Sequence, residues 1–440
     1  MANTYLTKTL GTPTNNKRWT FSAWVKKSHV GSDINTLFGA GGSNTNFGSI
    51  WVNYSNGMIQ FHSATSGGQT GGSVRLLNLL RDIASWYHIV VSFDSTNSTA
   101  GDRVKIYING IRGTNFDGTP DYPNLNIASF INSNIAHTVG KDSYRSAGYY
   151  NGSASHIHFI DGTVYAASSF GSTDSTTGEW TINTAPNVTY GNNGFAILKD
   201  GNTITDQSPN SNNFSLGGGA VTTIKDCPDN NFATMNPADV TKGAGTTVYT
   251  NGNTTVSISN TARNASRSSL AFTAGKFYAE CKVISVGGDV RIGVMGIDGT
   301  VAQPVNFANN TNPYSFEYGY SYRTNGQKEN NNSASSYGAS YGNGDIIGVA
   351  FNATNGSITF YKNGASQGVA FSSLNSNYWV FYCTLLSSAS VSWNFGNGFF
   401  GTTAITTNSG NGYAGADGKS KFNYAVPSAH SALSTKGLNQ

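Results

Sequence analysis

The sequence predicts an all-β protein with two antiparallel β-sandwich domains, jelly-roll or lectin-like, joined by a polar connector. Short apolar stretches with strand-like alternation recur along the chain and are separated by Gly, Asn and Ser clusters. Only 11% of the residues are charged, against about 25% in an average domain, while Gly, Tyr and Phe number 53, 23 and 24. A hairpin pattern also occurs twice, as VKIYING (104–110) and ITFYKNG (358–364).

Residues 1–170 form the first predicted sandwich. The strand candidates are WTFSAWVKK, SIWVNYS, MIQFHSA, WYHIVVSFD, RVKIYING and HIHFIDG. The leucine-rich stretch 74–88 is consistent with a helix or a strand, and we favour a strand followed by a short helical turn near Asp82.

Residues 171–240 are rich in Asn, Thr and Pro, with one strand candidate, GFAILKD (194–200), and we interpret them as a connector that packs partly on a neighbour. Strand candidates resume over 241–440, the second predicted sandwich. They are TVSIS, KFYAECKVIS, VRIGVMGI, YSFEYGYSYR, DIIGVAFN, SITFYKNG, YWVFYCTLL and ASVSWNFG. The two Asn-Gly pairs suit type I′ turns, in which both central residues need positive φ. The repeated hairpin fits either shared turn chemistry or two sandwiches built alike.

Charge and hydropathy argue against several classes of partner. The 26 basic and 22 acidic side chains are scattered, so no basic run follows a nucleic-acid backbone. The N-terminus lacks the apolar core of a signal peptide, and WVFYCTLL (379–386), the longest apolar run, is too short to span a bilayer. We therefore expect no nucleic acid, no membrane insertion and synthesis in a cytoplasm. The three cysteines are far apart and are expected to act as small buried hydrophobes.

We expect no catalytic residues and no metal site. No two acidic residues stand at i and i+2, as a glycosidase strand would require, and no Gly-x-Ser-x-Gly motif is present. His156 and His158 share one strand face, but two imidazoles are an incomplete metal site, so we favour an outward-facing pair with Ile157 and Phe159 packing inward. No cofactor is expected. Calcium remains an open alternative without assigned ligands, although Asp142 and other aspartates stand in predicted loops.

Two resemblances cover most of the chain. Residues 275–400, through GKFYAEC, RIGVMG, GDIIGVAFNATNGSITFYKNGASQGVAF and ASVSWNFGNGFF, resemble a SPRY domain. The first sandwich resembles a laminin-G-like, concanavalin A-like jelly roll, through WTFSAWVK, WYHIVVSFD, DRVKIYINGIRG and NGSASHIHFIDG. The SPRY resemblance implies a binding module without catalytic activity of its own. The stretch 159–180 and the closing SALSTKGL are similar to segments of bacteriophage structural proteins, which implies a virion protein.

Three functions are compatible with these resemblances. The favoured one is a non-enzymatic tail fibre or receptor-binding component that contacts host surface polysaccharide alongside other virion proteins. It would be a homo-oligomer, plausibly a trimer. The alternative is a capsid decoration or cement protein, which is favoured by the first sandwich beginning near Met1 without an attachment region. A glycan depolymerase is the weakest hypothesis, because paired carboxylates are missing.

Tyrosines in polar loops are the candidate ligand-binding residues, because Tyr among Ser, Asn and Gly supplies rigid amphipathic contact surface. The candidates are Tyr144, Arg145, Tyr149 and Tyr150 in 141–152, and Tyr337 and Tyr341 in 314–344. We expect Tyr337 and Tyr341, beside Gly-rich turns, to be exposed.

Overall fold

The computed structural model describes residues 3–29, 33–54, 57–65, 70–199, 203–240, 246–259, 261, 263–297, 319–406 and 412–439. The chain divides into two compact units, residues 1–223 and 224–440. Each unit is a sandwich of antiparallel sheets, so the predicted all-β class is confirmed.

The first unit contains fifteen of the strands in the described part of the chain. They are β1 (Tyr5–Thr9), β2 (Arg18–Lys27), β3 (Asn35–Ser43), β4 (Asn46–Tyr54), β5 (Met58–Ala64), β6 (Thr70–Leu79), β7 (Trp86–Asp94), β8 (Val104–Ile108), β9 (Ile111–Arg112), β10 (Ala136–Val139), β11 (Gly152–Asp161), β12 (Gly171–Thr173), β13 (Trp180–Ile182), β14 (Phe195–Ile197) and β15 (Ser215–Gly218). Two short 3-10 turns, η1 (Ala100–Asp102) and η2 (Ala167–Ser169), accompany them. Residues 74–79 are strand, as predicted, but residues 83–85 form a bend instead of the expected helical turn.

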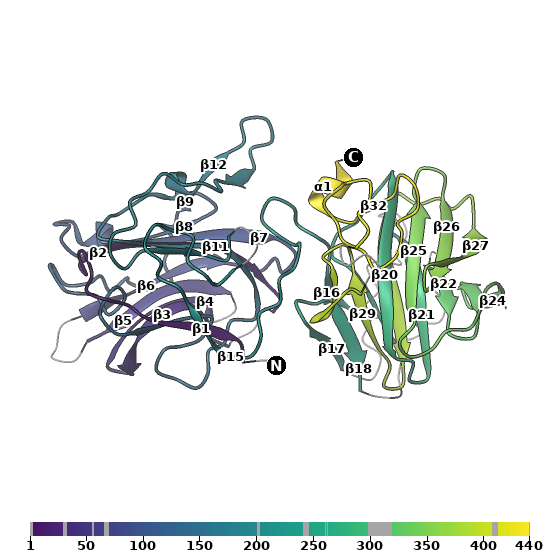
Figure 1. The fold of residues 1–440 in the computed structure, drawn as a ribbon, viewed down its shortest axis with the longest axis horizontal. Helices are drawn as coiled ribbons and strands as arrows, with labels where there is room; N and C mark the ends of the chain where they lie inside the picture. The colour runs from purple at the N-terminus through teal and green to yellow at the C-terminus, as the bar shows by residue number, and fades with distance from the viewer. Residues whose placement is uncertain are drawn as a thin grey trace. The chain divides into compact units, whose positions relative to one another are not determined.

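Two sheets form the layers of this unit (Figure 1). The seven-stranded sheet has the order β15-β1-β10-β3-β4-β5-β6, and the six-stranded sheet has the order β14-β11-β2-β7-β8-β9. β12 and β13 pair separately. Because side chains alternate between the faces of a strand, each sheet turns one apolar row inward.

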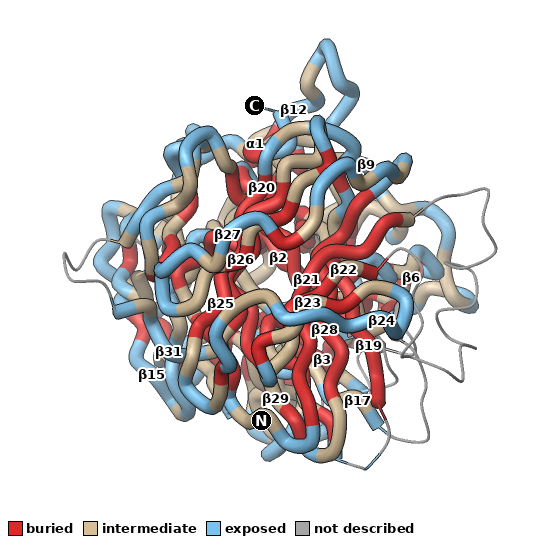
Figure 2. The backbone as a smooth tube through the Cα atoms, turned by 90° about the vertical axis from the view of Figure 1, so that its right-hand side faces the viewer, coloured by how far each residue is buried: buried red, intermediate tan, exposed pale blue. Residues whose placement is uncertain are grey.

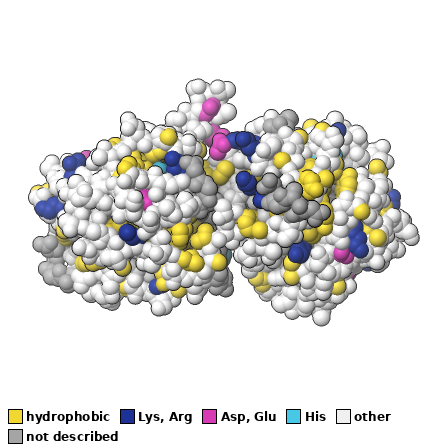
Figure 3. All heavy atoms as spheres, in the orientation of Figure 1, with side chains coloured by type: hydrophobic (Ala, Val, Ile, Leu, Met, Phe, Trp, Pro, Cys, Tyr) yellow, Lys and Arg dark blue, Asp and Glu magenta, His cyan; other side chains and the backbone are white. Residues whose placement is uncertain are grey.

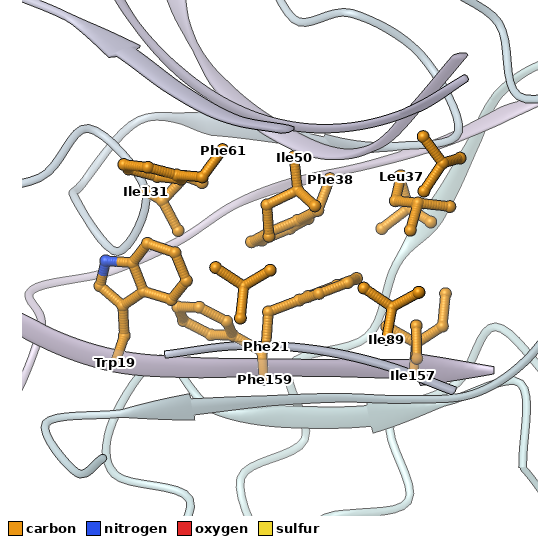
Figure 4. Packing of buried hydrophobic residues seen from close by; sticks show 14 of the residues in the cluster. Trp19, Phe21, Leu37, Phe38, Ile50, Phe61, Ile89, Ile131, Ile157 and Phe159 are labelled. Carbon is orange, nitrogen blue, oxygen red and sulfur yellow. The ribbon is translucent and has the colours of Figure 1, made fainter. Parts of the chain in front are cut away.

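Aromatic side chains from the two layers meet in the core (Figure 4). Phe21 on β2 stacks on Phe38 of β3, with ring centroids 5.2 Å apart, and Phe38 also packs at 5.3 Å against Phe159 of β11. Trp19 contacts Phe61 of the opposite sheet at 5.8 Å. All five side chains are fully buried, so the interior of this unit is closely packed.

A β-bulge modifies the predicted histidine pair. The register between β11 and β2 shifts between Ser155 and His158, and His156 adopts a φ of 47°. Ile157 and Phe159 point into the core, as predicted. His158 is only 2% exposed and its Nδ1 lies 2.9 Å from the Tyr190 hydroxyl. His158 therefore lies on the outward face of the sheet, opposite Ile157 and Phe159, but a later segment covers that face.

That later segment belongs to the stretch interpreted as a connector, and the interpretation is wrong for residues 171–223. Trp180 donates from Nε1 to Nδ1 of buried His88 at 3.0 Å, so β13 covers the outer face of the six-stranded sheet. β14 pairs with β11, and β15 pairs with β1. Phe195 and Phe214 lie in the core. These residues complete the first sandwich instead of linking it to the second.

The second unit contains the remaining strands and a short helix of the described part of the chain. They are β16 (Met235–Val240), β17 (Thr247–Thr250), β18 (Thr255–Ile258), β19 (Arg263–Ser268), β20 (Lys276–Ser285), β21 (Asp289–Ile297), β22 (Gly319–Arg323), β23 (Gln327–Asn330), β24 (Ser333–Ser336), β25 (Ile346–Asn352), β26 (Ser357–Lys362), β27 (Ala365–Phe371), β28 (Tyr378–Leu386), β29 (Ser390–Asn394), β30 (Phe399–Phe400), β31 (Thr403–Ala404), β32 (Ser431–Ala432) and α1 (Thr435–Leu438).

Two large sheets again form the layers, in the orders β16-β19-β28-β21-β22-β23-β24 and β17-β18-β29-β20-β25-β26-β27. β21 and β28 are buried, whereas the edge strand β24 is exposed along its length (Figure 2). The core joins the layers through aromatic contacts, such as Phe351 with Trp379 at 4.7 Å and Phe381 with Trp393 at 6.2 Å. Phe232 and Met235 are buried in this unit, so residues 224–240 are not connector either.

The two repeated hairpins have the same local construction. Asn109 and Asn363 have φ of 47° and 49°, and the glycine after each has φ of 82°, so the predicted positive φ at both central positions is confirmed. Each Asn side-chain oxygen also accepts a backbone N–H at 2.8 Å, from His88 in the first unit and from Ile346 in the second. The turn asparagine thus ties its hairpin to the strand before it in both sandwiches.

Candidate functional site

The loop of residues 140–151 is held at the start of β3. The Gly140 N–H donates to the Leu37 carbonyl at 3.1 Å, and the Thr36 N–H donates to the Gly148 carbonyl at 3.0 Å. Between these anchors the loop lies over the outer face of the seven-stranded sheet. Phe61 points into the core, so its neighbour His62 on β5 faces the loop side.

We call the first group on this face the Trp51 cluster, which comprises Phe47, Trp51, His62, Tyr144 and Arg145. The Tyr144 ring packs on Phe47 at 4.6 Å, and Phe47 in turn contacts Trp51 at 6.0 Å and His62 at 5.0 Å. Phe47 and Trp51 are at most 3% exposed and form the floor. Tyr144 is half-buried and Arg145 is exposed, so these two form the accessible layer.

The Arg145 guanidinium carbon lies 4.8 Å from the Tyr144 ring centroid and 5.8 Å from that of Trp51. Both distances fall within the range of cation–π contacts. Arg145 Nε lies 3.8 Å from Oδ2 of Asp142, whose side chain is fully buried. Burial raises the pKa of Asp142. Burial and then Arg145 lower the pKa of His62, so this imidazole is neutral at pH 7.

A second group, the Tyr5 cluster, comprises Tyr5, Lys141 and Tyr149. The Lys141 ammonium lies 4.9 Å from the Tyr5 ring centroid, and the Tyr149 ring lies 6.2 Å from the same ring. The Tyr5 ring lies on the backbone of Gly217 in β15, where a Cβ would come within 2.2 Å of Tyr5 Cε2. Each cation of the loop is therefore paired with an aromatic ring that a sheet or loop residue holds in place.

Tyr150, the fourth candidate of this loop, is partly buried and uses its hydroxyl within the fold. Its hydroxyl donates to the carbonyls of Lys26 and Ser153, each at 3.1 Å. Burial raises its pKa well above the ordinary value. Because its hydroxyl holds the loop to β2 and β11, Tyr150 could offer a ligand only its partly exposed ring.

The expectation that Tyr341 is exposed is also wrong. Its side chain is 5% exposed and lies in the core of the second unit, and its hydroxyl lies 2.9 Å from the Val290 carbonyl and 2.8 Å from that of Tyr322. Tyr337 is partly buried against Tyr322 and Phe360, and burial raises its pKa to about 12. Residues 314–318 lie outside the described residues.

The second unit carries a buried charged network on its seven-stranded sheet. Asp289 accepts from Arg263 at 2.7 Å and from Arg291 at 3.1 Å, and Glu329 lies 2.8 Å from Arg323. Arginine pairing lowers the pKa of Asp289 despite its burial. Three arginines thus pair with two carboxylates across β19, β21, β22 and β23, and we interpret this network as structural.

The sequence placed Tyr144, Arg145 and Tyr149 in one loop but did not reveal the residues on which Tyr144 and Arg145 lie. Phe47, Trp51 and His62 lie on β4 and β5, about 80 to 100 residues earlier in the chain. The sequence signal for these supporting residues was the alternation of side chains along the strands. In MIQFHSA, Phe61 takes the inner face and leaves His62 on the other, but nothing in the sequence says which loop crosses that face.

Within the described ranges, no group of three or more His, Cys, Asp or Glu side chains is placed to hold a metal ion. Among the same residues, no helix has the length and apolar character needed to cross a membrane. Much of the face visible in Figure 3 is uncharged, with only scattered basic and acidic side chains.

Family models identify both sandwiches. One described as "Concanavalin A-like lectin/glucanases superfamily" matches residues 2–168, and one described as "SPRY domain" matches residues 276–398. The chain contains both domains. The laminin-G-like and SPRY resemblances of the sequence are thereby confirmed.

Relatives resemble only part of the chain. Ran-binding protein 9 of Danio rerio is 36% identical over 103 residues, which cover 23% of this chain and 17% of the relative. Ran-binding protein 9 of Homo sapiens is 35% identical over 103 residues, covering 23% of this chain and 14% of the relative. The chain thus spans less than a fifth of either relative. The solved SPRY domain of human HERC1 is 17% identical, with a TM-score of 0.30, and covers 36% of this chain and 96% of its own.

Proposed function

We propose that the chain is a non-enzymatic, glycan-binding component of a bacteriophage virion, and that its first sandwich contacts host surface polysaccharide. The observation that supports this proposal best is the accessible layer of the Trp51 cluster. There Tyr144 and Arg145 stand over buried aromatic rings, held by a loop with fixed ends. A rigid aromatic surface with a polar edge is suited to ligands that carry both apolar and hydroxyl faces.

The remaining expectations form part of the same proposal. The protein would assemble with other virion proteins as a homo-oligomer, with a trimer as the arrangement expected of an appendage. Several shallow sites on one particle would then bind together, and avidity exceeds single-site affinity by about 10²- to 10⁴-fold when the geometry allows it. No cofactor takes part.

The proposal is tested by attachment of the purified, assembled protein to host cells. Arg145→Gln combined with Tyr144→Ala should weaken attachment, while host polysaccharide incubated with the parent protein should keep its chain length. Arg112→Gln is the control, since its side chain is 40% exposed and that of Arg145 is 42% exposed. Shortened polysaccharide would favour a depolymerase. Unchanged attachment, with labelled antibody decorating only the capsid, would favour capsid decoration.

A further inference from the structure

The loop 140–151 presents two cations beside aromatic rings. Lys141 and Arg145 are four residues apart, so their Cα atoms are separated by at most about 14 Å. Lys141 lies over Tyr5, and Arg145 lies over Tyr144 and Trp51. The two clusters therefore form adjacent subsites that one extended polymer reaches together.

Two carboxylates act on this surface: Asp142 within the loop, which pairs with Arg145, and the exposed Asp121, which acts electrostatically on His62 of the Trp51 cluster. Asp142 is the only acidic residue of 140–151, and its side chain is fully buried. Its Oδ2 atom lies 3.8 Å from Arg145 Nε, beyond hydrogen-bond distance. Asp117, which follows β9, forms a 2.5 Å ion pair with Arg75.

Another exposed arginine of the same sandwich is paired differently. Arg112 Nη1 lies 3.0 Å from Asp102 Oδ1, at a carboxylate that is 33% exposed. The Arg145 guanidinium pairs with Asp142 at the longer distance of 3.8 Å and also contacts the Tyr144 hydroxyl and two ring faces, so we expect part of its N–H fork to bind an anion from solution. A planar guanidinium recognises a carboxylate with two parallel hydrogen bonds, and a lysine acts beside it as a point charge.

We propose that the ligand of this surface is an acidic polysaccharide whose sugar carboxylates are bound by Arg145 and Lys141, with Tyr144, Tyr5 and Tyr149 against the sugar rings. This inference rests on the proposed glycan-binding function and specifies the ligand class. Charge-assisted contacts of this kind also weaken as salt rises, because exposed charges are screened.

The experiment uses polygalacturonate and the same polymer after chemical reduction of its carboxyl groups, with binding to the full-length protein followed by biolayer interferometry. Polygalacturonate should bind at least about tenfold more tightly than the reduced polymer, which corresponds to about 1.4 kcal/mol. Arg145→Gln and Lys141→Gln should each remove most of this preference, whereas Arg112→Gln should keep it. Circular dichroism melting confirms that each variant is folded.

Equal binding of the two polymers, or binding of neither, would overturn the inference. The same conclusion follows if Arg112→Gln weakens binding as much as Arg145→Gln, because the preference would then reflect overall charge. Tighter binding of poly(glycerol phosphate) than of polygalacturonate would overturn the carboxylate assignment in favour of a phosphate ligand. None of these outcomes decides the proposed function, which stands or fails with host-cell attachment.

Discussion

At the scale of single residues, the two Asn-Gly turns show why glycine is required. The glycine of each turn has a φ of 82°, and an aromatic side chain from a distant segment packs against it. A Cβ on Gly110 would lie 2.4 Å from the Trp180 ring, and a Cβ on Gly364 would lie 2.6 Å from Tyr424 Cδ1. The turn type was predictable from the dipeptide alone. The aromatic cover was not, because it comes from 60 to 70 residues further along the chain.

Gly364→Ala should therefore destabilise the protein more than Gly368→Ala. Both glycines have similar φ, 82° and 84°, but Gly368 has no atom within 4 Å of its would-be Cβ. Gly368→Ala should cost about 1–2 kcal/mol from the left-handed backbone alone. Gly364→Ala should cost about 1–3 kcal/mol more from overpacking against Tyr424. Urea unfolding of both variants checks the difference, and equal losses would contradict it.

The candidate tyrosines also show that long-range packing partners are not predictable from the local sequence. Composition identified loops rich in Tyr, Ser and Gly, but burial depends on the carbonyl groups that surround each hydroxyl. Tyr341 and Tyr150 donate to backbone carbonyls and serve folding, whereas Tyr144 packs at the surface. Sequence spacing carries no information about these long-range partners.

Tyr341→Ala should lower the free energy of unfolding by about 3–5 kcal/mol, as for other large aromatic residues truncated in a core. Tyr144→Ala should lower it by less than about 1.5 kcal/mol, because its ring is half-exposed. Chemical denaturation measures both values. A small effect of Tyr341→Ala would show that the second core does not depend on this ring.

At the scale of elements, the boundary between the sandwiches lies at residues 223 and 224, although composition changes near 170 and 240. Polar, turn-rich sequence was interpreted as connector, but short strands with few apolar residues also have this composition. β14 contributes only three residues and still closes one edge of the six-stranded sheet. The candidate GFAILKD predicted a strand here, but three strand residues do not reveal that it pairs with β11, about 40 residues earlier in the chain.

Truncation after residue 170 and after residue 223 should show which of the two positions ends the first sandwich. A fragment of residues 1–223 should be soluble and β-rich, whereas 1–170 should aggregate, because it lacks Phe195, Phe214 and the Trp180 cover over His88. Circular dichroism and size-exclusion chromatography of both fragments provide the measurement. A folded, monodisperse 1–170 fragment would restore the connector interpretation.

At the scale of the whole molecule, the large pKa shifts that matter near neutral pH belong to histidines in the first sandwich and to a glutamate in the second. In the first, burial lowers the pKa of His88 and His158 to about 3 and that of His137 to about 4. The Trp180 N–H points at Nδ1 of His88 and the Asn132 N–H points at Nε2 of His137, so a proton at either nitrogen would face a donor. In the second, burial raises the pKa of Glu280 to about 7.

These shifts predict that the two sandwiches respond to acid in opposite directions between pH 7 and pH 5. The unfolded chain protonates its histidines near pH 6.5. In the folded first sandwich, the three buried histidines stay neutral until about pH 3 to 4. Its stability should therefore fall by about 2 kcal/mol for each buried histidine. Folded Glu280 takes up a proton near pH 7 and the unfolded chain only near pH 4.5. The second sandwich should therefore gain about 2 kcal/mol from this group.

Hydrogen exchange of the intact chain at pH 7 and pH 5, corrected for intrinsic rates, separates the two responses because each peptide belongs to one sandwich. Protection should decrease in β2, β7 and β11 and increase in β20 and β25. Glu280→Gln should remove the acid-dependent gain of the second sandwich even if it lowers overall stability, since the readout is the change with pH. The carboxylate also accepts the N–H groups of Asn423 and Tyr424 at 2.8 Å, so the residues around them should follow the same pH dependence. If protection in both sandwiches changes in the same direction, the buried histidines and Glu280 do not control the acid response of this protein.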